Sequence, residues 1–144
     1  MNIAIVDDVQ KETAEFTEAV REYGALNRTG IEVTAFVSAE DFFADYFPLR
    51  YTLIVLDIFM DGMTGLEATE RIKEMDRNAL IVFLSSSEEH YPEAFRLHAF
   101  DFLNKPASKE RIFRLLDDIT ARTTKVNGGT AQFHHEDNEF FSEV

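Results

Sequence analysis

Short apolar runs alternate with segments of helical periodicity along most of this chain. The runs occupy residues 3–6, 31–36, 53–56, 80–84 and 100–103. We interpret them as strands buried on both faces, which is typical of a parallel sheet covered by helices. Because a longer segment of mixed polarity follows each run, the pattern predicts five strand–helix units in succession.

Helical spacing is clearest in the first and last of the intervening segments. Apolar residues recur there at positions i, i+3, i+4 and i+7, namely Phe16, Ala19, Val20 and Tyr23 in one segment and Ile112, Leu115, Leu116 and Ile119 in the other. Thr64 with Glu67 predicts a complete capping box at a helix start. Gly24 predicts the end of the first helix, and two further helices are expected after Ser87 and Ser108.

The five units cover residues 1–122 and predict a single α/β domain. Such alternation is typical of an open, doubly wound parallel sheet with helices on both faces and right-handed crossovers. We expect the strand order 2-1-3-4-5. After residue 122 the composition changes to two adjacent glycines, two adjacent histidines and four acids against one lysine. We therefore expect residues 123–144 to form a linker or tail. Two alternatives stay open: the chain is truncated before an output domain, or the domain acts alone.

Composition narrows the classes of function. The chain has 144 residues with 27 acidic and 14 basic side chains, a net charge of −13. DNA binding draws its affinity from Lys and Arg on phosphates, so DNA binding by this segment alone is not expected. The absence of cysteine excludes disulfides and cysteine-based metal sites. No apolar run is long enough to span a membrane and no signal peptide is present, so we expect a soluble cytoplasmic protein.

Polar residues follow four of the five predicted strands. Asp7 and Asp8 follow the first, Asp57 the third, Ser85 the fourth and Lys105 the fifth. Ligands of such sheets bind outside the carboxyl ends of the strands. Three carboxylates brought together there need a cation, and Mg²⁺ accepts carboxylate and phosphate oxygens. The set predicts phosphoryl transfer to Asp57, with Asp7 and Asp8 as metal ligands and with Lys105 and Ser85 contacting the phosphate.

Four sequence pieces carry a resemblance to a known family. They read NIAIVDD (2–8), LIVLDIFMDGMTG (53–65), VFLSSSEEH (82–90) and AFDFLNKP (99–106). In this order at strand ends, they resemble the receiver domains of response regulators in two-component signalling, which have a flavodoxin-like or CheY-like fold. The resemblance covers residues 2–122 and is strongest to receivers that precede LytTR-type DNA-binding domains. Asp61 stands where many members have proline, and Ser85 replaces the commoner threonine.

The resemblance implies roles for individual residues at the phosphorylation site. Asp57 accepts a phosphoryl group from a sensor histidine kinase, while Asp7, Asp8, Asp57 and the backbone carbonyl of Phe59 bind Mg²⁺. Lys105 contacts the phosphate. The resemblance also implies that the peptide bond between Lys105 and Pro106 is cis.

It also implies how the signal leaves the site. Ser85 and Phe102 form a switch pair, in which the hydroxyl moves toward the phosphate and the ring turns inward. The face made by the helix after Ser87, the strand at 100–103 and the helix after Ser108 is then remodelled to control an output such as transcription. The same face is a candidate homodimer surface. DNA contact would come only through a C-terminal output domain that is missing here.

The sequence is also compatible with alternative functions and residue roles. A phosphatase with an aspartate nucleophile resembles this pattern, but such enzymes carry a second acid two positions after the nucleophile, where this chain has Phe59. A degenerate receiver that acts only as an interaction module is a second alternative. Ser85 could be an ordinary turn residue and Phe102 an ordinary core residue. A nucleotide or flavin binder is disfavoured because no glycine-rich phosphate loop follows a strand.

Overall fold

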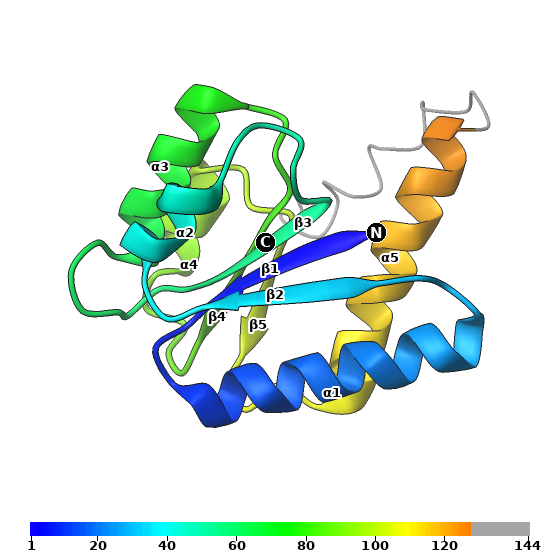
Figure 1. The fold of residues 1–144 in the computed structure, drawn as a ribbon. Coiled ribbons are helices and arrows are strands. Elements are labelled where there is room, and N and C mark those ends of the chain that lie inside the picture. Colours follow the sequence, from blue (N-terminus) through cyan, green and yellow to red (C-terminus); the bar gives the residue numbers. More distant parts are fainter. Residues whose placement is uncertain (128–144) are drawn as a thin grey trace.

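Strands and helices alternate regularly along the described part of the chain (Figure 1). The computed structural model describes the backbone of residues 1–127 and the side chains of residues 1–122. The strands are β1 (Asn2–Val6), β2 (Glu32–Phe36), β3 (Leu53–Asp57), β4 (Ile81–Ser85) and β5 (Asp101–Asn104). The helices are α1 (Gln10–Asn27), α2 (Ala39–Asp45), α3 (Gly65–Met75), α4 (Tyr91–Arg96) and α5 (Lys109–Asn127). The predicted succession of five strand–helix units is confirmed.

The strands form one parallel sheet in the order β2-β1-β3-β4-β5. This is the predicted order. From β1 the chain adds β2 on one side and then β3, β4 and β5 on the other, so the order of the strands switches between β1 and β3. Register aligns the strand ends that matter for function, since Val6 pairs with Leu56, Asp57 with Leu84, and Ser85 with Asn104. The residues that follow β1, β3, β4 and β5 therefore emerge along one edge of the sheet.

Helices cover both faces of the sheet and create two separate apolar cores. In Figure 1, α1 and α5 lie on one side of the sheet, and α2, α3 and α4 on the other. Ile3 and Ile5 of β1 point into the first core, and Ala4 and Val6 into the second. Fully burying an aliphatic side chain of this size contributes about 1.5–3 kcal/mol, so the central strands fix the position of the sheet edge firmly.

One strand departs from the expected burial on both faces. β2 lies at the edge of the sheet, where Glu32, Thr34 and Ala35 are exposed and Val33 and Phe36 are partly buried. An edge strand has a neighbour on one side only and is less completely covered by helices. The prediction of a doubly buried strand was therefore wrong for β2, while β3 and β4 are buried along their whole length.

The first helix also extends beyond the predicted end. α1 continues past Gly24 to Asn27, and Arg28 closes it in the left-handed conformation (φ 53°), donating its N–H to the carbonyl of Gly24. A Cβ atom at position 24 would lie 2.9 Å from the carbonyl oxygen of Thr29. The glycine is thus explained by the close return of the chain after the helix, not by the helix end.

At the other end of the domain, α5 runs to Asn127, past the expected domain boundary at residue 122. The remainder of the predicted linker or tail, residues 128–144, lies outside the described residues. Among the helices that the structure describes, none is long and apolar enough to cross a membrane.

Candidate functional site

Three carboxylates meet at the carboxyl edge of the sheet. One oxygen from each of Asp7, Asp8 and Asp57 lies within 4.8 Å of the others. Asp7 and Asp57 are buried, with 1% and 3% of their surface exposed, whereas Asp8 is exposed. The backbone N–H of Val9 donates to Asp7 Oδ1 (2.9 Å), and that of Phe59 donates to Asp57 Oδ1 (3.3 Å). The structure therefore brings the predicted acidic residues together.

A single ammonium group faces this acidic cluster. Lys105 Nζ lies 3.0 Å from Asp7 Oδ2 and 3.4 Å from Asp57 Oδ2. The backbone N–H of Lys105 donates to the carbonyl of Ser85 (2.7 Å), which ties the β5–α5 loop to the end of β4. The Lys105–Pro106 peptide bond is cis. Lys105 therefore lies where the sequence predicts it, beside Asp57.

A fourth carboxylate, which sequence reasoning missed, also contacts this lysine. Glu12, in the first turn of α1, places Oε2 2.7 Å from Lys105 Nζ, closer than either aspartate. Asp8 precedes α1, which begins at Gln10, so helical spacing does not relate Glu12 to the acidic pair. An acid in a first helical turn is ordinarily explained by the helix dipole alone, and position along the chain carries no signal that Glu12 contacts Lys105.

The electrostatics of the site follow from burial and from mutual repulsion. Burial, followed by the charge of Asp7, raises the pKa of Asp57 from 3.8 to about 6, although Lys105 opposes the shift. Burial alone would lower the pKa of Lys105, but its close contacts with Glu12 and Asp7 and the charges of Asp57 and Asp7 outweigh burial and raise the pKa above its usual range. The positive charge of Lys105 therefore does not fully compensate the negative charges of the carboxylates, and Lys105 itself stays protonated.

One buried oxygen has no hydrogen bond to account for it. Asp7 Oδ2 accepts none from the described residues, although Lys105 Nζ lies 3.0 Å away. Buried carboxylate oxygens are normally hydrogen-bonded or bound to a cation. An acidic triad with a buried oxygen that accepts no hydrogen bond is typical of a Mg²⁺ site, because hard oxygen ligands suit this ion. The donor set of Asp7, Asp8 and Asp57 fits such an ion.

Two further predicted residues lie on β4, which pairs with β3, and on β5, the next strand of the sheet. Ser85, at the end of β4, is fully buried and its Oγ accepts the N–H of Ser87 (3.2 Å). Phe102, on β5, is 3% exposed and packs against Phe83 and Tyr91, with ring centroids 6.4 and 5.1 Å apart. The ring of Phe102 is already inward, so this conformation needs no phosphoryl group here.

The loop from β3 to α3 holds the acceptor strand close to its helix. A Cβ atom at Gly65 would collide with the backbone carbonyl of Asp57, so only glycine permits this approach. Thr64 caps α3, and its side chain accepts the N–H of Glu67 while Glu67 accepts the N–H of Thr64, which confirms the predicted capping box. Phe59, two residues after Asp57, is 49% exposed and contacts the ring of His90 edge-on.

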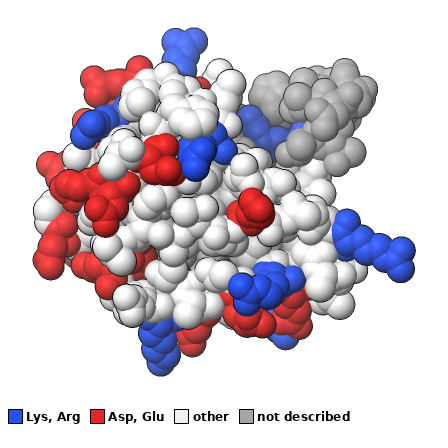
Figure 2. Space-filling view, in the orientation of Figure 1, with Lys and Arg blue, Asp and Glu red and all other residues white. Residues whose placement is uncertain are grey.

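Acidic side chains cover much of the surface around α2 and the loop after β3, at the left of Figure 2, in keeping with the net charge of −13.

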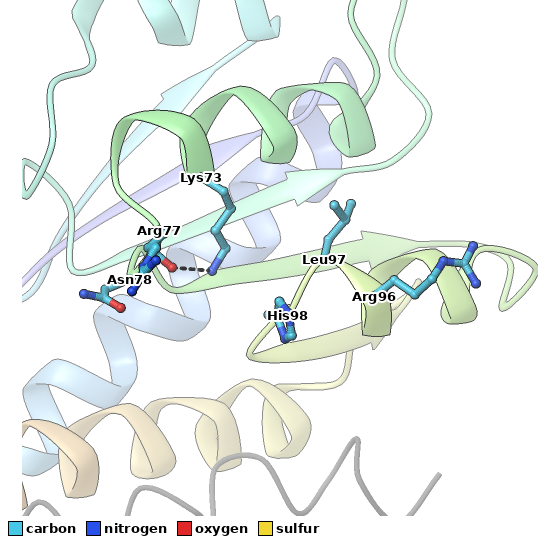
Figure 3. A pocket seen from close by; sticks show the side chains of 6 residues that line it. All are labelled: Lys73, Arg77, Asn78, Arg96, Leu97 and His98. Atoms are coloured by element: carbon cyan, nitrogen blue, oxygen red, sulfur yellow. Dashed lines mark hydrogen bonds between the residues drawn. The ribbon is translucent and has the colours of Figure 1, made fainter.

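A basic cavity lies on another part of the surface. It has a volume of about 410 Å³ and lies at the ends of α3 and α4 (Figure 3), lined by Lys73, Arg77, Asn78, Arg96, Leu97 and His98. These segments precede β4 and β5, so the cavity is at the sheet edge opposite to Asp57.

Two cations of this cavity already have partners. Lys73 Nζ donates to the carbonyls of Arg77 (3.3 Å) and Ala79 (2.9 Å), in the turn that follows α3. Arg96 pairs with Glu93 of α4 (3.4 Å), and Figure 3 shows its side chain extending away from the others. The cavity lies at the edge of the sheet opposite to Asp57 and is separate from the acidic site.

Comparison with known proteins agrees with this geometry. The response regulator receiver domain family matches residues 3–117. The chain belongs to the response regulator receiver domain family. Receiver domains are phosphorylation-dependent signalling domains of two-component systems, phosphoacceptors rather than enzymes in their own right. The predicted family is thus confirmed, and so is the expectation of a phosphoacceptor in place of a phosphatase.

Individual relatives of this receiver domain support the same assignment. The transcriptional regulatory protein YpdB of Escherichia coli (strain K12), a LytTR-type regulator, is 28% identical over 126 residues, which are 84% of this chain and 48% of YpdB. The crystal structure of the response regulatory domain of protein mrkE from Klebsiella pneumoniae has a TM-score of 0.72 and 26% identity, covering 84% of this chain and 96% of that one.

A third similarity concerns the fold alone. Response regulator TrrA from Thermotoga maritima, in complex with Mg(2+)-BeF, has a TM-score of 0.70 at 22% identity and covers 82% of this receiver domain and 97% of that chain. The receiver domain spans about half the length, or less, of the curated relatives that it matches.

Proposed function

We propose that Asp57 is the residue that accepts the phosphoryl group, from a sensor histidine kinase, and that Asp7, Asp8, Asp57 and the backbone carbonyl of Phe59 hold the Mg²⁺ ion required. The observation that carries the proposal is the convergence of two buried aspartates and one ammonium at the end of β3. Lys105 Nζ lies within 3.4 Å of both aspartates, and Asp7 Oδ2 accepts no hydrogen bond from the described residues.

The protonation states suit a nucleophilic carboxylate. With a pKa of about 6, Asp57 is mostly ionised at neutral pH, and it becomes more so when a cation binds beside it. An oxygen of Asp57 forms a bond to phosphorus while the bond from phosphorus to the kinase histidine nitrogen breaks. Lys105 then pairs with one phosphoryl oxygen, and the hydroxyl of Ser85 donates to another. When bound, Mg²⁺ neutralises charge on the phosphoryl oxygens.

The signal is proposed to leave the site through Ser85 and Phe102. To reach the phosphoryl group, the Ser85 hydroxyl gives up its present contact with the N–H of Ser87 and so pulls on the start of the β4–α4 loop. Phe102 packs against Tyr91 at the start of α4 and is already inward. The conformational change therefore begins in the β4–α4 loop and α4, while the ring of Phe102 keeps its inward position. The change in the loop and α4 alters the surface formed by α4, β5 and α5.

The wider setting is part of the same proposal. Residues 1–122 form the receiver, and residues 123–144 lead toward an output domain in a longer protein, as the length of YpdB suggests. Through that domain the receiver controls an output such as transcription in the cytoplasm, and any DNA contact belongs to that domain. The surface of α4, β5 and α5 is the proposed homodimer contact.

Phosphorylation with a small donor tests the assignment of Asp57. Incubation with acetyl phosphate and Mg²⁺ should label the chain, as measured by intact mass, and Asp57→Asn should abolish the label. Asp61→Asn, which removes an exposed acid four residues away, should leave it unchanged. Full labelling of Asp57→Asn would place the acceptor elsewhere. No labelling of the unmodified chain would support a degenerate receiver that only binds partners, and continuous release of inorganic phosphate over many turnovers would support a phosphatase.

A further inference from the structure

The shortest contact of the site ammonium involves a residue outside the acidic triad. Lys105 Nζ lies 2.7 Å from Glu12 Oε2, against 3.0 Å for Asp7 and 3.4 Å for Asp57. The side chain of Lys105 is 11% exposed and that of Glu12 is 30% exposed, so the pair is partly screened from water. The shortest ionic contact of the lysine is thus with α1 and not with the proposed acceptor.

An arriving phosphoryl group needs the same ammonium. An ammonium has three N–H donors, and three carboxylates already lie within 3.4 Å of Lys105 Nζ. Asp7 and Asp57 belong to the triad whose oxygens lie within 4.8 Å of one another, so a cation bound there would neutralise them directly. Glu12 is outside that triad. Its negative charge therefore remains beside Lys105 when the cation and the phosphoryl group are in place.

We propose that Glu12 is a positioning residue that competes with the phosphoryl group for Lys105 and thereby sets how tightly the site holds a phosphoryl group. The proposal rests on the proposed function of the site. In the resting state Glu12 holds the ammonium toward α1. When the phosphoryl group binds, the ammonium turns from Glu12 to a phosphoryl oxygen, and the loss of the Glu12 contact weakens the bound state. Through Glu12, α1 therefore lowers the affinity of the site for the phosphoryl group.

The test compares three variants of acidic residues on α1, using a phosphoryl analogue. Beryllofluoride binding at saturating Mg²⁺ is measured by NMR titration for the unmodified chain, Glu12→Gln, Glu12→Asp and Glu15→Gln. Glu15 is an exposed acid on the same helix for which no contact with Lys105 is present in the structure, so Glu15→Gln removes an equal charge without touching the ammonium. Glu12→Asp keeps the charge but shortens the side chain. Affinity for Mg²⁺ alone is measured in parallel.

We expect Glu12→Gln to bind beryllofluoride about two- to fivefold more tightly, which corresponds to the loss of one partly exposed ion pair. Glu12→Asp should show part of that gain, and Glu15→Gln less than about a twofold change. Affinity for Mg²⁺ alone should not increase in Glu12→Gln, because Lys105 then turns more fully toward Asp7 and Asp57. A merely structural role of Glu12 would weaken both ligands together.

Each result bears on one or both proposals. An unchanged beryllofluoride affinity in Glu12→Gln, or a gain equal to that of Glu15→Gln, overturns the role of Glu12 while leaving the acceptor site intact. A parallel loss of beryllofluoride and Mg²⁺ affinity in Glu12→Gln also overturns it. If the unmodified chain binds no beryllofluoride in the presence of Mg²⁺, the proposed function and the role of Glu12 both fail.

Discussion

Replacing Asp57 with asparagine should stabilise the domain in the absence of divalent cations. The asparagine side chain is similar in shape but uncharged, so the substitution removes the repulsion with Asp7 and the cost of burying the charge. The pKa of Asp57 rises from 3.8 to about 6 on folding, and one unit corresponds to about 1.36 kcal/mol. Ionised Asp57 therefore costs the folded state at most about 3 kcal/mol. The side chain is only 4% exposed, so little of this cost is lost to solvent screening.

The pH dependence gives the sign of the effect. Because the pKa is higher in the folded state, the folded protein binds the proton more strongly than the unfolded chain between 3.8 and about 6. The unmodified protein thus loses stability as the pH rises through this window, and Asp57→Asn does not. The difference between them should be near its full value above about pH 7, about half of that near pH 5, and small below about pH 4.

Chemical denaturation in EDTA, followed by far-UV circular dichroism at several pH values, measures this difference. We expect Asp57→Asn to be more stable by about 2–3 kcal/mol near pH 8, with an unchanged denaturant dependence. Asp61→Asn is the matched control and should change stability by less than about 0.5 kcal/mol. Adding Mg²⁺ should stabilise the unmodified protein more than Asp57→Asn. A destabilised Asp57→Asn, or a gain that does not vary with pH, would refute the reasoning.

Three further substitutions test the framework that positions the site. Thr64→Ala removes the capping hydroxyl of α3 and should lower stability by about 1 kcal/mol in thermal or urea unfolding; no loss would mean that the cap contributes nothing. Gly65→Ala forces the start of α3 away from the end of β3, and should both destabilise the fold by more than about 2 kcal/mol and slow acetyl phosphate labelling. Normal labelling of a stable Gly65→Ala protein would contradict the close approach. Tyr23→Phe removes the 2.7 Å hydrogen bond to Asp117 between α1 and α5 and should cost about 1 kcal/mol, an effect that should disappear in an Asp117→Ala background.

The sequence allowed the sheet and most of the site to be predicted because both depend on local order. Mainly apolar segments of four to six residues identified the strands, although Glu32, Thr34 and Asp101 lie within them. Parallel alternation then places the carboxyl ends of all strands along one edge of the sheet. Asp7, Asp57 and Lys105 each directly follow or end a strand, so knowing the strands was enough to bring them together. Chain position alone could therefore reveal these contacts.

Features that depend on tertiary neighbours could not be predicted in the same way. Glu12 contacts Lys105 only because α1 begins beside the β5–α5 loop, a relation that spacing along the chain does not reveal. The end of α1 was predicted too early because glycine is required at position 24 by the close approach of the Thr29 carbonyl and does not mark the helix terminus. The exposure of β2 follows from its place at the edge of the sheet, and the polar residues Glu32 and Thr34 within the segment 31–36 were the signal that could have indicated it.

Stability is unevenly distributed among the helices of this domain, and α4 has the weakest anchorage. It is six residues long, and Ala94 is the one residue of it that is fully buried, with Tyr91 partly buried beside Phe102. α1, by contrast, buries Phe16, Ala19, Val20 and Tyr23. Segments with few buried apolar groups open locally at low free energy. Amide hydrogens of α4 should therefore exchange with solvent well before those of α1, and α4 can shift without opening either apolar core.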